Sequence, residues 1–185
     1  MRRIVAVVLL LALTACSSGD AEEKSAPKGG FDVPAGLTLA DPGTETTVGE
    51  GLAVGFPSAD DESGTALALG VSKASKAPRR DLSLYRTPAG MQAYYVRVTV
   101  GNRGPAAAAL PEGLPWWLHV AGDVLVPPTA TPAGFAACPA PKVGKTMAAG
   151  QTAKGCLLFF VKKGTAVESV DFQPAGVTTA VRWTL

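Results

Sequence analysis

The sequence predicts an all-β protein, an antiparallel β-sandwich of about seven to nine strands, and three observations predict it. Short apolar runs are separated by turn residues at intervals of about 8 to 12 residues, which is typical of a sandwich or a barrel. Several runs alternate apolar and polar side chains, as half-buried strands do. No long stretch has the i, i+3, i+4, i+7 spacing of an amphipathic helix. An eight-stranded barrel is the alternative.

The alternation places the individual strands. It is clearest at residues 94–100, where one face carries Tyr94, Val96, Val98 and Val100 and the other carries Tyr95, Arg97 and Thr99. A second alternating run covers residues 65–75. We expect further strands near 47–56, on both sides of an Ala-Gly-Asp turn at 121–123, and at 152–161, 166–172 and 178–185. Trp183 is expected to close the core.

The N-terminus has the organisation of a secretory signal. Arg2 and Arg3 precede an uninterrupted apolar run at residues 4–13, which is too short to cross about 30 Å of hydrocarbon. The next residues, Leu-Thr-Ala-Cys16, resemble the bacterial lipobox, in which the cysteine is acylated and becomes the first mature residue. The resemblance implies a cleaved signal peptide at 1–15, palmitate on Cys16 and a cell-membrane location on the extracytoplasmic face. Cleavage near Ala15 that leaves a free thiol, and twin-arginine export, are the alternatives.

Composition divides the remaining chain into two parts. Residues 16–46 are mostly small, polar or proline residues, so we expect a flexible linker, followed by one β-sandwich domain at 47–185. The precursor has 17 basic and 15 acidic residues, and two of the basic residues belong to the signal. The mature chain therefore has a formal charge of about zero, and nucleic acid is not an expected partner.

The cysteines predict one disulfide. If Cys16 carries lipid, Cys138 and Cys156 remain as a pair in an oxidising compartment, where we expect them to be bonded. Their spacing is not the Cys-x-x-Cys of a redox site. A structural zinc site needs four ligands, and His119 is the single histidine of the chain, so we expect no metal and no cofactor.

The candidate binding residues are Trp117 and His119. Alternation along 116–120 directs both to the face opposite Trp116, and we expect them to share a solvent-exposed face that stacks on a sugar or holds a partner peptide. The alternative places one tryptophan in the core and the other at the edge of the sandwich. The proline-rich stretch at 127–141 suggests a long ordered loop, anchored by Phe135 and Cys138.

Motifs of enzymes are incomplete in this chain, so we expect no enzymatic activity. There is no Gly-x-Ser-x-Gly and no His-x-x-x-His. Ser25 and Lys28 have Ser-x-x-Lys spacing but fall in the expected linker. Gly144-Lys-Thr146 lacks the first glycine of a phosphate loop, because Pro139 occupies that position. The acidic run at 60–62 lacks the spaced ligands of an EF-hand.

Two segments carry a family resemblance. Residues 94–104, which end in Asn-Arg-Gly, and residues 149–164, which contain Gly-x-x-x-x-Gly and end in Lys-Lys-Gly, resemble the telokin-like, immunoglobulin-fold domain of unknown function on many bacterial lipoproteins. The resemblance covers roughly residues 45–185 and implies an immunoglobulin-like sandwich. The proline-rich stretch and the pair of Cys138 and Cys156 depart from the family pattern. The family brings no agreed activity, so it assigns no site residue.

These observations together favour a membrane-anchored binding or interaction module whose partner is an envelope protein or a glycan. The first alternative is a small-ligand carrier with the loop at 127–141 as a lid over a pocket between the sheets. The second alternative is an unrecognised envelope enzyme.

Overall fold

Two packed β-sheets form the domain. The structure is a computed structural model and describes residues 33–57, 64–83, 85, 87 and 89–185. Within these residues there are eleven strands and one short 3-10 helix, η1. They are β1 (Glu45–Thr47), β2 (Gly51–Pro57), β3 (Gly64–Lys76), η1 (Arg79–Leu82), β4 (Met91–Asn102), β5 (Ala108–Ala109), β6 (Trp116–Val120), β7 (Val124–Val126), β8 (Thr146–Met147), β9 (Thr152–Lys162), β10 (Val167–Phe172) and β11 (Val181–Thr184).

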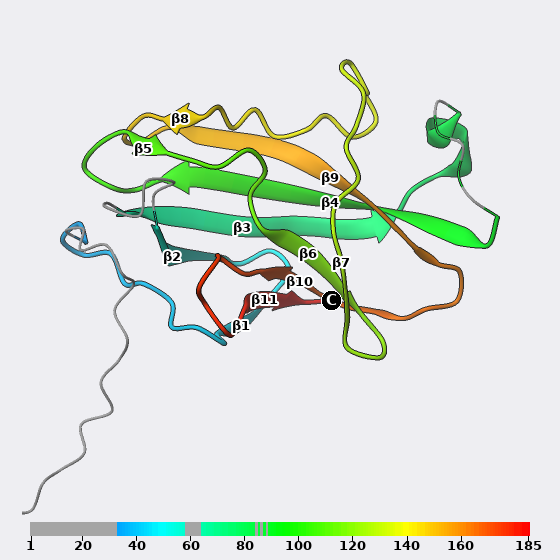
Figure 1. Ribbon diagram of the computed structural model, residues 1–185, viewed down its shortest axis with the longest axis horizontal. Coiled ribbons are helices and arrows are strands. Elements are labelled where there is room, and N and C mark those ends of the chain that lie inside the picture. The colour runs from blue at the N-terminus through cyan, green and yellow to red at the C-terminus, as the bar shows by residue number, and fades with distance from the viewer. Residues whose placement is uncertain (1–32, 58–63, 84, 86, 88) are drawn as a thin grey trace, which may run out of the picture.

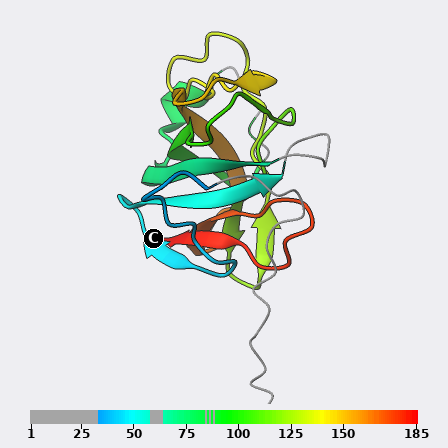
Figure 2. The ribbon, with the colours of Figure 1, turned by 90° about the vertical axis from the view of Figure 1, so that its left-hand side faces the viewer.

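The strand order confirms the predicted sandwich. A four-stranded sheet has the order β2-β3-β4-β9, and a five-stranded sheet has the order β1-β11-β10-β6-β7. Figures 1 and 2 show the first sheet lying above the second. All neighbouring strands are antiparallel except β1, which pairs with β11 in parallel. The count of eleven exceeds the predicted range because β5 and β8 form a separate two-residue pair.

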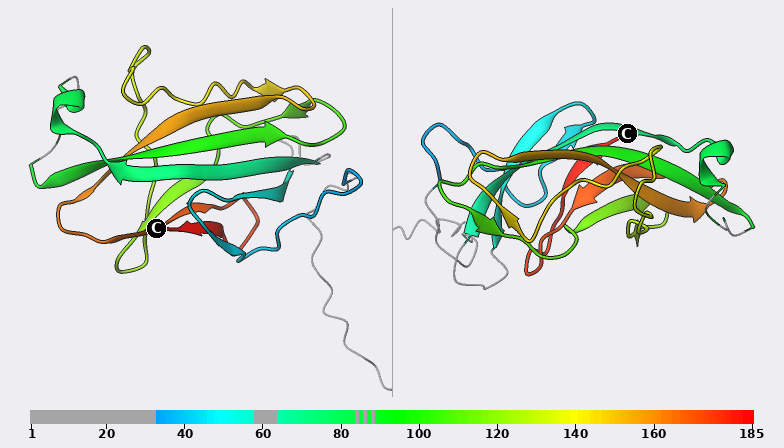
Figure 3. Two further views of the ribbon diagram at one scale, coloured as in Figure 1. Left: turned by 180° about the vertical axis from the view of Figure 1, so that it is seen from behind. Right: turned by 90° about the horizontal axis from the view of Figure 1, so that it is seen from above.

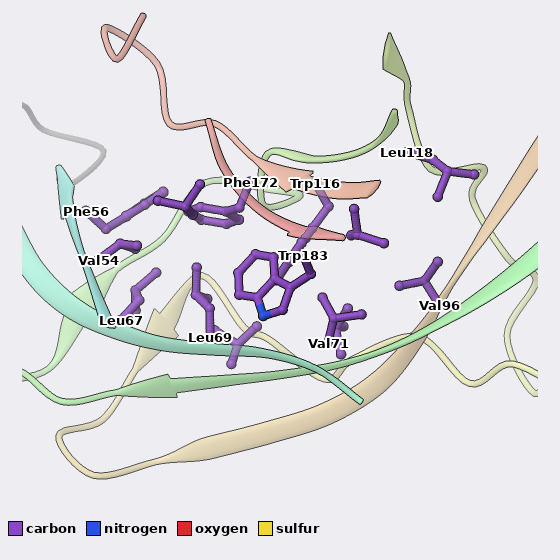
Figure 4. Close-up of a cluster of buried hydrophobic side chains, with 14 of the residues drawn as sticks. Val54, Phe56, Leu67, Leu69, Val71, Val96, Trp116, Leu118, Phe172 and Trp183 are labelled. Atoms are coloured by element: carbon purple, nitrogen blue, oxygen red, sulfur yellow. The ribbon is translucent and has the colours of Figure 1, made fainter. Parts of the chain in front are cut away.

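The core lies between the two sheets. Alternation along β4 directs Val96, Val98 and Val100 inward, as predicted, and Trp183 is fully buried beside them. Figure 4 shows the aromatic centre of this core, in which Trp116 lies 4.9 Å from Phe172 and 5.5 Å from Trp183 between ring centroids. Burial of these large rings contributes to the apolar area that stabilises the sandwich.

A second, smaller core lies on the outer face of the four-stranded sheet. The loop at 127–141 covers the part of this face around Tyr95 and Leu158, where Phe135 and Cys138 pack. The disulfide between Cys138 and Cys156 joins the loop to β9, with 4.9 Å between the two Cα atoms. The sequence predicted this pairing. It did not predict that the loop would form its own apolar cluster outside the sandwich.

The same loop covers the edge of β9. The amide of Thr129 donates to the carbonyl of Leu158 at 2.6 Å, and the amide of Cys156 donates to the carbonyl of Pro139 at 2.8 Å. Figure 3 shows the loop and β9 side by side along much of the strand. Pro141 lies so close to Gly155 that a Cβ atom there would collide with it. Covering the edge in this way protects β9 from pairing with another chain.

Ordered backbone pairing begins before residue 47, where the sequence suggested that the domain starts. Leu39 forms a parallel bridge with Ala53, the amide of Ala40 donates to the carbonyl of Ala53 at 2.7 Å, and β1 pairs with β11. The predicted signal peptide, Cys16 and the first part of the linker lie outside the described residues. No helix in the described ranges is long and apolar enough to cross a membrane.

Candidate functional site

The candidate site is the outer face of the five-stranded sheet, which we call the Trp117 face. The strand register determines which side chains lie on this face. Trp117 pairs with Asp171, Asp171 pairs with Arg182, and Arg182 pairs with Glu45, so these four side chains form one row across the sheet. The neighbouring row contains Leu125, His119, Ser169, Thr184 and Thr47.

The two predicted site residues lie on this face, but they differ in exposure. Trp116 and Leu118 point into the core, so Trp117 and His119 point outward, as the alternation predicted. Trp117 is half-buried. His119 is only 7% exposed, so the expectation that it shares a solvent-exposed surface with Trp117 is wrong.

The burial of His119 has a local cause. Its Nε2 atom lies 3.0 Å from a carboxylate oxygen of Asp123, and its Nδ1 atom lies 3.5 Å from Asp171. Asp123 follows Gly122 in the turn between β6 and β7, and both residues have positive φ, at 58° and 88° respectively. This turn brings the Asp123 carboxylate back over the histidine.

Asp171 is the centre of a hydrogen-bonded network. It is 1% exposed although it lies on an outer face. Its carboxylate accepts hydrogen bonds from the hydroxyl of Ser169 and, at 3.2 Å, from the guanidinium of Arg182. Arg182 also donates to Glu45 at 3.3 Å. A buried carboxylate is tolerated when charged and polar partners compensate for the loss of hydration, and these contacts provide that compensation.

The cross-strand neighbours explain how Asp171 becomes buried. Trp117 lies opposite it on β6 and Arg182 lies opposite it on β11, so two long side chains flank the carboxylate. Sequence reasoning missed Ser169, Asp171 and Arg182. Alternation in 167–172 marks Ser169 and Asp171 as outward-facing. Their partners depend on a strand order that no local pattern encodes.

The Trp117 face presents few types of chemical group. The hydroxyl of Ser169 donates to the carboxylate of Asp171, and the same carboxylate lies beside Nδ1 of His119. Among the described residues, no group of three His, Cys, Asp or Glu side chains is placed to hold a metal ion. The face therefore offers one aromatic ring opposite a hydrogen-bonded network that contains one guanidinium and several oxygen atoms.

The carrier alternative requires the loop at 127–141 to cover a pocket between the sheets, and the loop does not lie there. It lies on the outer face of the four-stranded sheet, and aliphatic and aromatic side chains fill the interior of the sandwich. Two shallow hollows of about 260 and 300 Å³ lie elsewhere. One lies along Gly49–Gly51 and β3, and the other lies beside η1 and the start of β4.

Comparison with known proteins identifies similar folds. No protein-family model and no curated protein sequence matches the chain. The secreted Mycobacterium tuberculosis protein MPT63 has a similar solved structure, with a TM-score of 0.54 and 14% identity over 79% of this chain and 100% of MPT63. A "putative lipoprotein (ycdA)" of Bacillus subtilis gives a TM-score of 0.47 and 20% identity over 64% of this chain and 36% of its own length. The likeness to MPT63 supports the β-sandwich fold.

Proposed function

We propose that this protein is a lipid-anchored module of the cell envelope that binds an envelope protein or a glycan through the Trp117 face. The lipobox at residues 13–16 supports the anchor and the extracytoplasmic location. The disulfide between Cys138 and Cys156 supports an oxidising compartment. The secreted nature of MPT63, which shares the fold, agrees with that location. The resemblance to telokin-like lipoprotein domains supports the same assignment.

The observation that carries the proposal is a half-buried tryptophan held beside a buried, ordered polar network. Trp117 lies opposite Asp171, whose carboxylate is fixed by Ser169 and Arg182. Polar groups that are already ordered by their neighbours lose little conformational entropy when a ligand binds, which raises affinity. Tryptophan and arginine are also the residue types that most often dominate interface energies.

An apolar side chain next to the network extends the face. Leu125 pairs with His119 and is 38% exposed. A partner that contacts Leu125 and Trp117 would bury apolar area at the centre of a polar rim, which is the usual composition of a protein interface. A glycan would stack on the indole ring and bond to the guanidinium of Arg182, whose side chain is 31% exposed.

Site-directed photocrosslinking on intact cells tests the proposal. A photoreactive residue in place of Leu125 should give one recurrent adduct, identified by mass spectrometry. The same probe in place of Lys145, whose side chain is 82% exposed next to β8, is the matched control and should not give that adduct. Trp117→Ala should abolish the Leu125 adduct. An identical adduct pattern from both positions, or no recurrent adduct from Leu125, would contradict the proposal.

The anchor is tested separately. Radiolabelled palmitate should enter the wild-type protein and should be absent from the Cys16→Ser variant. Labelling that is unchanged in that variant would refute the lipobox assignment.

A further inference from the structure

The two sheets differ in charge. The four strands of the β2-β3-β4-β9 sheet contain no Asp or Glu and five basic residues, which are Lys73, Lys76, Arg97, Lys154 and Lys162. The strands of the other sheet contain Glu45, Glu168 and Asp171 against one basic residue, Arg182. The four-stranded sheet is therefore the more basic of the two, although the mature chain has a formal charge near zero.

Three of the cations lie together at the centre of this outer face, and we call them the cation row. Lys73 pairs directly with Arg97 across β3 and β4. Arg97 pairs with Cys156, and Lys154 lies two residues before Cys156, so Lys154 is diagonal to Arg97 on the same face. All three residues are exposed. Figure 3 shows β3, β4 and β9 running side by side.

The fold itself does not account for this arrangement. Like charges directly opposite each other on a sheet are destabilising. Arg97 has a structural contact, since its guanidinium donates to the carbonyl of Ala137 at 3.2 Å. Lys73 and Lys154 form no ion pair with any described residue. Among the described segments joined to these strands, the acids are Glu50 before β2 and Asp81 in η1, and Asp81 pairs with Arg80.

We propose that the cation row binds the anionic headgroups of the phospholipid bilayer in which the chain is anchored. This inference depends on the lipid anchor of the proposed function. Val33 follows Cys16 by 17 positions, so even a fully extended chain keeps the domain's first described residue within about 60 Å of the anchor. At that distance the headgroups act at a high effective concentration. Each lysine or arginine near an anionic bilayer adds a small favourable term.

The contact is electrostatic and involves no insertion. The large apolar residues that are exposed in the described chain are Val33, Val124, Leu125 and Leu185, and none of them belongs to the four-stranded sheet. A second consequence concerns orientation. With the cation row against the bilayer, the Trp117 face on the opposite sheet points away from the membrane, toward a partner in the envelope.

Vesicle sedimentation tests the cation row without the anchor. The full-length chain carrying Cys16→Ser is mixed with phosphatidylcholine vesicles that contain or lack phosphatidylglycerol. We expect it to sediment only with the anionic vesicles at about 0.1 M salt and to be released at about 1 M salt, where screening is nearly complete. Lys73→Glu with Lys154→Glu should lower the partition coefficient at least about 25-fold, which corresponds to about fivefold for each lysine.

The matched control has the same change in net charge. Arg103 and Lys163 are exposed residues beyond the ends of β4 and β9, and changing both to glutamate should leave partition within about twofold. Lys73→Gln with Lys154→Gln should give an intermediate loss, and circular dichroism checks that each variant is folded. Equal losses in test and control variants, or sedimentation without phosphatidylglycerol, would overturn the proposal. Binding of the chain to wall polymer fragments and not to vesicles would also overturn the proposal.

The outcomes separate the two proposals. If the Lys73 and Lys154 changes do not reduce vesicle binding while the Leu125 adduct persists, the proposed interaction module is supported and the proposed orientation on the membrane is wrong. If the Leu125 adduct is absent while Lys73 and Lys154 govern vesicle binding, the membrane contact stands without the partner face.

Discussion

The hydroxyl of Thr65 donates to Oδ1 of Asn102 at 2.7 Å in the fully buried end of the sandwich. The same oxygen accepts the amide of Gly104 at 2.9 Å, and Nδ2 donates to the carbonyls of Ala106 and Met147 at 2.8 and 2.9 Å. Asn102 thus uses both donors and both acceptor sites of its amide. It connects β3, the turn after β4 and β8.

Replacing Asn102 should be among the more destabilising changes outside the apolar core. Asn102→Ala leaves Thr65 and several backbone groups without partners in a buried site, so we expect a loss of about 3 kcal/mol in the free energy of unfolding. Asn102→Asp has nearly the same shape but directs an oxygen at the Met147 carbonyl, and it should also destabilise. Urea unfolding measures both. A loss below about 0.5 kcal/mol for both variants would refute this role.

Gly104 packs against the same hydrogen bond between Thr65 and Asn102. A Cβ atom at this position would collide with the hydroxyl of Thr65 and crowd Oδ1 of Asn102. The Asn-Arg-Gly sequence therefore has a physical explanation, because the asparagine fills the site and only glycine leaves room for its partners. The sequence identified this motif as a turn and as a family resemblance. It gave no sign of the bond to Met147, which lies 45 positions further along the chain.

The same limit applies to the candidate site. The period-two alternation at 94–100 correctly predicted which residues of β4 face the core, since side-chain direction in a strand is a local property. The alternation at 116–120 likewise separated Trp116 from Trp117. The burial of His119 was not predicted, because it depends on Asp171, which lies on a strand more than 50 positions away, and on the turn at Asp123.

The disulfide should matter for stability as well as for the position of the loop. Replacing Cys138 and Cys156 by alanine removes a cross-link between residues 18 positions apart. The greater chain entropy of the unfolded state should then lower the free energy of unfolding by about 3 kcal/mol. Thermal unfolding with and without a reducing agent measures the effect. The wild type should lose stability on reduction, whereas the double alanine variant should not respond. A wild-type transition that is insensitive to reduction would contradict the prediction.

Replacing Tyr95 by phenylalanine should not lower the stability of the domain. Its hydroxyl is buried and has no hydrogen-bond partner in the described structure, while its ring packs against Phe135 with 6.3 Å between centroids. Tyr95→Phe removes the unsatisfied hydroxyl and keeps the ring, so the free energy of unfolding should stay constant or rise by up to about 1 kcal/mol. Urea unfolding at neutral pH measures it. A loss above about 1 kcal/mol would indicate a hydroxyl partner.

The same variant should change the response to alkaline pH. Burial raises the pKa of Tyr95 above its ordinary value of 10.0, and Asp81 and Tyr85 raise this pKa further, whereas Arg97 lowers it. The folded state therefore holds the proton more tightly than the unfolded state. The stabilising effect is present below pH 10 and is lost as pH rises through the folded-state pKa. Tyr95→Phe should lessen this loss of stability. Part of the loss should remain, because the pKa of the partly buried Tyr85 is also raised. An unchanged alkaline profile would contradict the assignment.

The two adjacent tryptophans should respond very differently to truncation. Trp116 is 2% exposed and contacts both Phe172 and Trp183, so Trp116→Ala should cost about 3 to 5 kcal/mol. Trp117 is half-buried on the outer face, so Trp117→Ala should cost only about 1 kcal/mol.

Urea unfolding, with circular dichroism of the native state, measures both tryptophan variants. Trp117→Phe is the conservative control, because it keeps an aromatic ring at the position opposite Asp171 and should be nearly as stable as the wild type. Equal losses for Trp116→Ala and Trp117→Ala would place both rings in the stabilising core. The loss of the Leu125 adduct in Trp117→Ala would then reflect unfolding and would no longer support a binding face. A small loss for Trp117→Ala, together with loss of the adduct, assigns the indole ring to recognition.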